Sequence, residues 1–285
     1  MKLDPRCNAV RDDLADSRLR GQVQAARFVE GRPALVATGL ADLRRKPAAT
    51  APLDAQLWYG ESLSVFECKN GWAWVQGVRD GYVGFTPVQA LAGASDLLPS
   101  HQVSVPLTYR FPEPSIKAPP LDSLPMGALL RSIAKRDGFL ELHDGGYVFV
   151  RHAASADCGR PDWAETAQRF LGVPYLWGGR SFGGIDCSGL VQTGLLIAGH
   201  SAPRDSDMLR DDEALGRALA PNAPRQRGDL LFSPGHVIMA LDEADILHAN
   251  AYHLATVREA FSLFAERIAA RGEAITLLRR PYCLR

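Results

Sequence analysis

Residues 171–192 read LGVPYLWGGRSFGGIDCSGLVQ, a glycine-rich and aromatic stretch that runs into an apolar segment. Leucine and valine recur at nearly helical spacing over residues 190–196, so a buried helix is predicted to begin at Cys187. Unpaired backbone N–H groups and the positive end of the dipole at a helix start favour a thiolate. The stretch therefore predicts a nucleophilic cysteine with a lowered pKa; the alternative is a small apolar core residue.

A base for this thiol is expected from residues 227–241, which read RGDLLFSPGHVIMAL. Two β-rich runs flank the Pro-Gly pair, and this predicts a hairpin with His236 at the start of its second strand. His248 ends another short apolar run. An imidazole can accept a thiol proton while a polar group behind it fixes its orientation. The sequence therefore predicts a catalytic set of Cys187, His236 and His248.

The motifs around these residues resemble those of the NlpC/P60 cysteine peptidases of bacterial cell-wall turnover. Over residues 174–249 the chain contains, in the order found in that family, Pro-Tyr-Leu-Trp-Gly-Gly, Asp-Cys-Ser-Gly-Leu-Val-Gln, Arg-Gly-Asp-Leu-Leu-Phe, Gly-His-Val and His-Ala. The resemblance is closest to γ-D-glutamyl-L-diamino acid endopeptidases that carry SH3 domains ahead of the peptidase. It implies a papain-like α+β catalytic domain that requires no metal and no organic cofactor.

The resemblance also implies roles for residues around the nucleophile. Tyr175 matches a tyrosine whose hydroxyl contributes to oxyanion stabilisation. Tyr82, far upstream, matches a tyrosine that reaches the N-terminus of the substrate. The pocket for the L-Ala-γ-D-Glu part of the substrate is expected to be lined by Trp177, Asp186, Ser188, Asp205 and Ser206.

Several of these assignments have structural alternatives. Asp186 directly precedes the predicted helix and could simply cap it. Tyr82 could be a core or rim aromatic of its domain. For the third catalytic position, His253 or Asn250 is the alternative to His248. An acidic residue of the same upstream domain is expected to bind the substrate amine, and the candidates are Asp54, Glu61 and Glu67.

Short β-rich runs separated by glycine turns indicate small β-domains upstream of the peptidase. Residues 34–95 carry Leu-Asp, Gly-Trp and Asp-Gly-Tyr motifs that resemble a bacterial SH3 domain. The pattern recurs over residues 96–156, with a proline-rich loop at 111–120, and indicates a second SH3-like barrel. Residues 1–33 are charged and helix-prone and are predicted to form a helical lead-in, and residues 157–285 are predicted to form the catalytic domain.

The composition is that of a folded multidomain protein: 285 residues, 46% hydrophobic and 22% charged. Basic and acidic residues both number 32, so no global field would attract nucleic acid or an anionic membrane. Five scattered cysteines without a Cys-x-x-Cys pair argue against a disulfide framework and a zinc site. No apolar run is long enough to span a membrane, and the N-terminus lacks the apolar stretch of a signal peptide, so a cytoplasmic location is expected.

The resemblance implies a cysteine peptidase that acts on murein peptides with a free N-terminal L-alanine. It would hydrolyse the bond between γ-D-glutamate and diaminopimelate or lysine, in the recycling of peptidoglycan peptides. One alternative is an amidase or acyltransferase that uses the same Cys-His fold on another substrate. The other alternative is a non-catalytic protein whose SH3 pair binds wall peptides.

Overall fold

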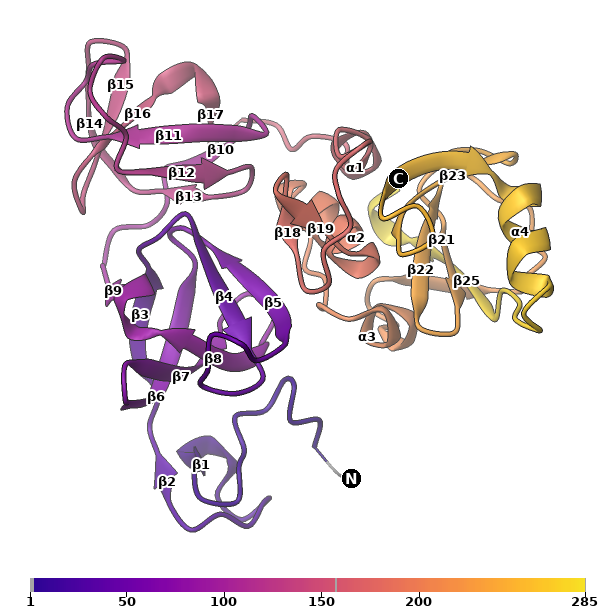
Figure 1. Cartoon of the computed structure of the whole chain (residues 1–285), viewed down its shortest axis with the longest axis horizontal. Coiled ribbons are helices and arrows are strands. Elements are labelled where there is room, and N and C mark those ends of the chain that lie inside the picture. The colour runs from indigo at the N-terminus through magenta and orange to yellow at the C-terminus, as the bar shows by residue number, and fades with distance from the viewer. Residues whose placement is uncertain (1–2, 157, 285) are drawn as a thin grey trace. The chain divides into compact units, whose positions relative to one another are not determined.

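The protein consists mainly of β-strands with a few short helices (Figure 1). The computed structural model describes residues 3–156 and 158–284. The chain divides into two compact units, one ending at Cys158 and one beginning at Gly159. This division lies next to the start of the catalytic domain expected at residue 157.

The first segment of the chain differs from its prediction, because no α-helix forms in residues 3–33. Strand β1 (Ala15–Asp16) pairs in parallel with β2 (Phe28–Val29), and a short 3-10 helix, η1 (Ser17–Leu19), follows β1. The Asp16 side chain accepts a hydrogen bond from the Arg18 backbone N–H at 2.9 Å, and such local bonds compete with helix formation. Ala9 and Leu14 instead pack against Phe66 and Trp74 of the first sheet. The predicted helical lead-in is therefore wrong.

A seven-stranded antiparallel sheet forms the first half of the N-terminal unit, in the order β5-β4-β8-β7-β6-β3-β9. Its strands are β3 (Arg32–Val36), β4 (Leu40–Arg44), β5 (Leu53–Trp58), β6 (Ser62–Lys69), β7 (Trp72–Gly77), β8 (Val83–Pro87) and β9 (Leu91–Gly93), with η2 (Val88–Ala90) before β9. The hairpin between β6 and β7 turns at Asn70 and Gly71, whose φ angles are +51° and +79°. Two consecutive positive φ angles are typical of the tight turn that matches strand twist.

The second half of the N-terminal unit contains two smaller sheets. A five-stranded sheet has the order β12-β11-β16-β15-β14, and a three-stranded sheet has the order β13-β10-β17. The strands are β10 (His101–Val103), β11 (Leu107–Phe111), β12 (Asp122–Pro125), β13 (Leu129–Leu130), β14 (Ser132–Arg136), β15 (Phe139–Leu142), β16 (Tyr147–Phe149) and β17 (Ala153–Ser155), with η3 (Val150–His152) before β17. The proline-rich segment forms the connection between β11 and β12, as expected. That this half is a second SH3-like barrel stays a prediction.

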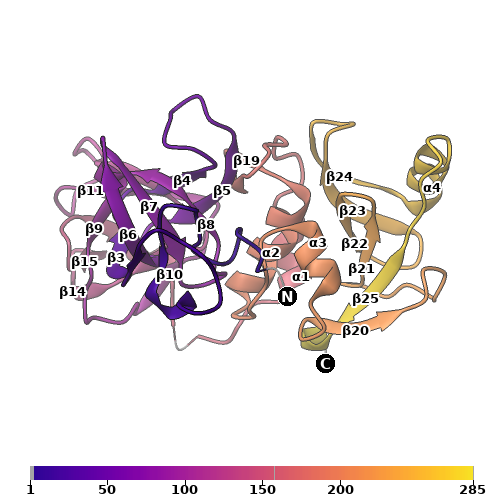
Figure 2. The ribbon, with the colours of Figure 1, turned by 90° about the horizontal axis from the view of Figure 1, so that it is seen from below.

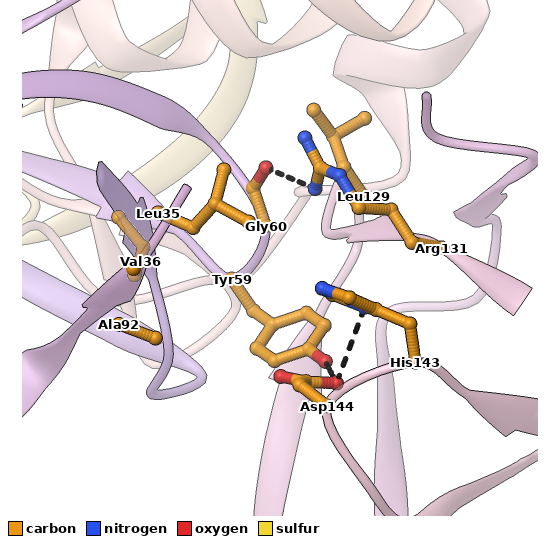
Figure 3. Close-up of a pocket in the computed structure, with 10 residues that line it drawn as sticks. Leu35, Val36, Tyr59, Gly60, Ala92, Leu129, Arg131, His143 and Asp144 are labelled. Atoms are coloured by element: carbon orange, nitrogen blue, oxygen red, sulfur yellow. Dashed lines mark hydrogen bonds and ion pairs between the residues drawn. The ribbon is translucent and has the colours of Figure 1, made fainter. Parts of the chain in front are cut away.

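Side chains at a small cavity of about 60 Å³ join the two halves of the N-terminal unit (Figure 3). The Tyr59 hydroxyl donates a 2.6 Å hydrogen bond to Asp144, and the guanidinium of Arg131 donates one of 2.7 Å to the Gly60 carbonyl oxygen. Burial and the bond to Asp144 raise the pKa of the Tyr59 phenol, so it remains a donor. These contacts between distant segments, together with packing of the Tyr59 ring in the core of the second half, make the two halves one unit.

The C-terminal unit begins with helices and continues into a sheet. Helix α1 (Trp163–Gln168) is capped by the Asp162 side chain, which accepts a hydrogen bond from the Glu165 backbone N–H. A short hairpin, β18 (Arg180–Ser181) and β19 (Gly184–Ile185), leads into α2 (Cys187–Ile197), and α3 (Ser206–Asp211) follows. None of the helices in the described part of the chain is long and apolar enough to cross a membrane.

The sheet of this unit has six strands in the order β20-β25-β21-β22-β23-β24. They are β20 (Gly216–Leu219), β21 (Leu230–Ser233), β22 (His236–Ala240), β23 (Asp245–Asn250), β24 (Ala255–Ala260) and β25 (Leu277–Pro281), with α4 (Phe261–Ala269) between β24 and β25 and η4 (Tyr282–Leu284) after β25. Figure 2 shows α2 and α4 on opposite faces of the sheet. Ile238 and Ile246 pack with Phe264 and Ile268 of α4. The α4 face therefore also carries His236 and His248, which lie two residues from these isoleucines on the same strands.

Candidate active site

Cys187 is the first residue of α2, and the glycine-rich turn before it fixes its position. The Asp186 side chain caps the helix, because its Oδ1 accepts a 2.6 Å hydrogen bond from the Gly189 backbone N–H. Gly179 and Gly189 have no room for a side chain. A Cβ on Gly189 would lie 2.4 Å from the Gly179 carbonyl oxygen, and one on Gly179 would lie 2.4 Å from the Gly184 carbonyl oxygen. The turn therefore packs tightly against the helix start that carries the thiol.

Asp186 is also one half of a buried ion pair with Arg204, a residue that the sequence analysis did not single out. The guanidinium donates to Oδ1 at 3.0 Å and to Oδ2 at 2.7 Å, and it also donates to Ser188 Oγ at 3.0 Å. The Gly178 backbone N–H donates to Oδ2 at 2.8 Å. Asp186 and Ser188 thus have protein partners that hold the turn and the helix together. Their expected role in substrate binding stays a prediction.

His236 and His248 lie side by side on neighbouring strands. His236 follows a two-residue turn in which Ser233 pairs with it across the hairpin and Gly235 has a φ of +68°, so the predicted Pro-Gly hairpin is confirmed. Nε2 of His236 lies 2.8 Å from Nδ1 of His248. His248 is only 1% exposed. Because Nε2 of His236 is taken by His248, Nδ1 is the nitrogen that remains for a thiol.

His236 and His248 begin a row of hydrogen-bonded side chains that continues to Glu259 and Arg267. No sequence motif marks these last two residues. Nε2 of His248 lies 2.7 Å from Oε1 of Glu259, and Arg267 of α4 donates to Oε2 of the same carboxylate at 2.9 Å. Phe264, one turn earlier on α4, has its ring centroid 5.3 Å from that of His248 and 6.3 Å from that of His236. No motif marks Glu259, because its proximity depends on strand pairing: His248 pairs with Val257, and Glu259 is the diagonal neighbour.

The thiol of Cys187 lies at the start of β22, where it hydrogen-bonds the backbone of Val237, directly after His236. Burial and the negative charge of Asp186 raise the pKa of this thiol to about 12, against the effects of the Val237 bond and of the Arg204 charge. The lowered pKa predicted from the helix start is therefore wrong. The sequence shows the helix terminus but does not show the burial that outweighs it.

The imidazoles are held neutral by the same surroundings. Burial, followed by the charges of His248, Arg271 and Arg267, lowers the pKa of His236 to about 3. Burial also lowers the pKa of His248 to about 4, although Glu259 acts in the opposite direction. At neutral pH the site therefore contains a neutral thiol and a neutral imidazole. Such a pair can transfer a proton during nucleophilic attack.

A groove with a volume of about 360 Å³ opens beside His236 and is lined by Tyr175, Trp177, Asn250, Arg267, Arg271 and Glu273 among others. Tyr175 is half-buried, and its backbone N–H donates to the Leu254 carbonyl oxygen at 2.9 Å. Burial raises the pKa of the Tyr175 phenol, with Cys187 and Asp186 acting in the same direction, and this keeps the phenol a hydrogen-bond donor. The Trp177 side chain is 63% exposed. The groove thus brings an aromatic wall and several charged groups close to His236.

The remaining predicted residues lie elsewhere. Asp205, directly after Arg204, is the N-cap residue of α3, and Ser206 is the first residue of that helix. Tyr82 is buried in the N-terminal unit, directly before β8. His253 and Asn250 bond each other, because Oδ1 of Asn250 accepts the His253 backbone N–H at 2.8 Å. Of the three residues considered for the third catalytic position, His248 is the one that meets His236.

Two segments of the chain match known protein families. Residues 172–269 match the NlpC/P60 family, and residues 43–91 match the bacterial dipeptidyl-peptidase SH3 domain. Dipeptidyl-peptidase 6 of Lysinibacillus sphaericus is 25% identical over 268 residues, which cover 85% of this chain and 98% of that protein. Gamma-D-glutamyl-L-lysine dipeptidyl-peptidase of Bacillus subtilis (strain 168) is 29% identical over 195 residues, 63% of this chain and 64% of that protein.

A solved structure shows the same fold. It is that of an NlpC/P60 family protein from Bacillus cereus ATCC 10987, with a TM-score of 0.75 and 20% sequence identity over 87% of this chain and 99% of that chain. The fold of most of this chain is therefore shared with a known structure.

Proposed function

Because the chain belongs to the NlpC/P60 peptidase family and carries a bacterial dipeptidyl-peptidase SH3 domain, we propose that it hydrolyses the γ-D-glutamyl–L-diamino acid bond of murein peptides with a free N-terminal L-alanine. The observation that carries the proposal is the hydrogen-bonded pair of His236 and His248 beside the Cys187 thiol. The printed names of two relatives, dipeptidyl-peptidase 6 and gamma-D-glutamyl-L-lysine dipeptidyl-peptidase, support the substrate class. Cleavage of such short peptides serves peptide recycling.

The reaction begins when Nδ1 of His236 takes the proton of Cys187 as Sγ attacks the γ-carbonyl carbon. The charge that develops on the carbonyl oxygen is stabilised by the Tyr175 hydroxyl and the Cys187 backbone N–H. The tetrahedral intermediate collapses when the C–N bond breaks, and His236 returns its proton to the departing amine. Water, deprotonated by His236, then hydrolyses the thioester and restores the thiol.

The free amine of the substrate requires a carboxylate and a polar partner, and the N-terminal unit offers both in one place. Asp54 and Tyr82 line the same groove of about 360 Å³. Glu61 is buried and accepts from the Trp58 backbone N–H at 3.1 Å, whereas Glu67 pairs with two arginines. Asp54 pairs with Arg45 at 2.6 Å, but it is the acidic candidate that lines a groove together with Tyr82, and on that ground we assign it to the amine.

The departing diamino acid is assigned to the groove beside His236. Arg271 and Glu273 line this groove as an ion pair with an N–O distance of 3.2 Å. The side chain of diaminopimelate ends in an ammonium and a carboxylate, whereas that of lysine ends in an ammonium alone. An arginine with a neighbouring carboxylate complements the former. On this basis we propose that the protein prefers diaminopimelate over lysine.

Product analysis with matched peptides tests the proposed function. L-Ala-γ-D-Glu-diaminopimelate is expected to yield L-Ala-γ-D-Glu and free diaminopimelate, and its N-acetylated form is expected to remain intact. Equal turnover of both peptides would contradict recognition of the free amine. Turnover of neither would contradict the proposed substrate class.

A further inference from the structure

We propose that Glu259, held by Arg267, is a positioning residue that fixes where the protons lie in the catalytic row, so that His236 presents an unprotonated Nδ1 to Cys187. The inference rests on the proposed role of Cys187 as nucleophile, but it does not depend on which peptide is cleaved. Glu259 and Arg267 act through the two imidazoles and not on the substrate.

The row is continuous and largely closed to solvent. Nε2 of His236 lies 2.8 Å from Nδ1 of His248, and Nε2 of His248 lies 2.7 Å from Oε1 of Glu259. The side chains of His248 and Glu259 are 1% and 10% exposed. Phe264 packs edge-on against the His248 ring. Buried polar groups must find partners within the protein, so each member of the row constrains the next.

The charge of Glu259 decides which nitrogens carry protons. Burial opposes ionisation of this carboxyl, but hydrogen bonds from Arg267 and His248 outweigh burial and keep the pKa of Glu259 below its ordinary value. An ionised carboxylate can only accept, so the proton of neutral His248 lies on Nε2. Its Nδ1 then accepts from Nε2–H of His236. His236 is left with a lone pair on Nδ1, the form that can take a thiol proton.

Arg267 prevents the protons of His248 and His236 from moving to their Nδ1 atoms. Without a cation beside it, a buried carboxyl tends to take up a proton and can then donate a hydrogen bond. A protonated Glu259 would donate to Nε2 of His248, whose Nδ1 would donate to His236, and Nδ1 of His236 would carry a proton toward the thiol. The Arg267 guanidinium is itself positioned by packing 4.4 Å from the ring centroid of Tyr252.

The same carboxylate has a second effect during the reaction. When the proton moves from Sγ of Cys187 to Nδ1 of His236, an imidazolium forms in a buried site, which is unfavourable without an opposite charge. Glu259 supplies that charge through His248, and the proton later leaves Nδ1 for the departing amine. Glu259 remains ionised throughout, as the buried carboxylate of a serine protease triad does.

Nitrogen-15 NMR of the full-length protein labelled at its seven histidines tests the inference without a substrate. In the wild type at neutral pH, we expect His236 and His248 each to be protonated at Nε2 and unprotonated at Nδ1. Their signals are assigned by their loss in His236→Gln and His248→Gln. A wild-type His236 with its proton on Nδ1 would overturn the proposal.

Two variants of Glu259 distinguish the effect of its hydrogen-bond acceptor from the effect of its negative charge. Glu259→Gln keeps an oxygen that can accept from His248, whereas Glu259→Leu removes both acceptor and charge. We expect Glu259→Leu to give mixed histidine tautomers and to lower kcat by roughly 10²-fold, with KM little changed. Glu259→Gln is expected to lie between Glu259→Leu and the wild type. Asp245→Asn is the matched control, because Asp245 forms an exposed pair with Arg258 on the same two strands.

The outcomes also show whether Glu259 and Arg267 position the protons of the two histidines or only stabilise the fold. Arg267→Lys, which keeps a cation, should retain more activity and a more uniform His236 tautomer than Arg267→Met. If a folded Glu259→Leu protein kept both the wild-type tautomers and the wild-type kcat, the inference would fail. If the wild-type tautomers were as expected but murein peptides were not cleaved, only the proposed function would fail. In that case, the rate of Cys187 alkylation by iodoacetamide should still fall in Glu259→Leu.

Discussion

Nε2 of His236 and Nδ1 of His248 lie 2.8 Å apart, although the two residues belong to different strands. This contact orients the His236 ring, because it engages one nitrogen and leaves the other for the thiol. It forms where β22 and β23 run antiparallel beneath α4. The arrangement of the two imidazoles therefore depends on the register of the sheet as well as on the residues themselves.

The pH dependence of kcat should reflect a neutral resting site. The lowered pKa values of His236 and His248, about 3 and about 4, mean that protonation removes the base only below about pH 4. The raised pKa of Cys187, about 12, means that no thiolate accumulates up to pH 9. We expect a nearly flat kcat from pH 5 to pH 9, measured at saturating peptide. An acid limb centred near pH 6.5 would show that His236 titrates as an ordinary histidine.

Removing the His248 ring should disable His236 without removing it. In His248→Ala, the His236 ring loses its partner and can rotate, so kcat should fall by about 10²-fold or more. His253→Ala is the matched control, because His253 bonds Asn250 and not His236, and its kcat should stay close to the wild-type value. Steady-state kinetics of both variants provide the measurement. A larger loss in His253→Ala than in His248→Ala would refute the assignment.

Replacing Arg271 should change the choice of diamino acid. In Arg271→Gln, the cation that complements the distal carboxylate of diaminopimelate is lost, so kcat/KM for that peptide should fall on the order of tenfold. The value for the lysine peptide should change little, since lysine has no such carboxylate. Arg258→Gln is the control, because Arg258 forms an exposed ion pair with Asp245 on neighbouring strands of the C-terminal sheet. A parallel fall for both peptides would argue against recognition of the carboxylate.

The buried pair of Asp186 and Arg204 should be important for stability. The Arg204 side chain is 0% exposed, so Asp186→Ala removes the carboxylate of a buried ion pair and is expected to cost about 3–5 kcal/mol of unfolding free energy. Asp211→Ala removes the partner of Arg210 at an exposed pair and should cost less than about 1 kcal/mol. Urea denaturation followed by circular dichroism measures both. Similar losses in the two variants would mean that the pair does not hold the turn.

The residues that the sequence revealed are those carried by local motifs. Cys187 begins a helix after a glycine turn, and His236 follows a Pro-Gly pair, so both are evident along the chain. Arg204 and Glu259 have no such local signal. They reach their partners only through a buried connection after α2 and through a diagonal strand contact.

Burial was the other quantity that the sequence could not supply. The helix start at Cys187 argues for a reactive thiolate, but the thiol is only 7% exposed and close to the Asp186 carboxylate, so its pKa rises. The helical lead-in predicted for the N-terminal segment does not form, for a related reason. Its leucine at position 14 packs against the first sheet, and the carboxylate of Asp16 bonds local backbone, so the apparent helical pattern is not used.

The most direct test of the account compares the wild-type protein with Cys187→Ala on L-Ala-γ-D-Glu-diaminopimelate, with products identified by mass spectrometry. We expect the wild type to release L-Ala-γ-D-Glu and diaminopimelate, and the folded Cys187→Ala protein to release neither. Cleavage by Cys187→Ala at the wild-type rate would contradict the central claim that this thiol is the nucleophile.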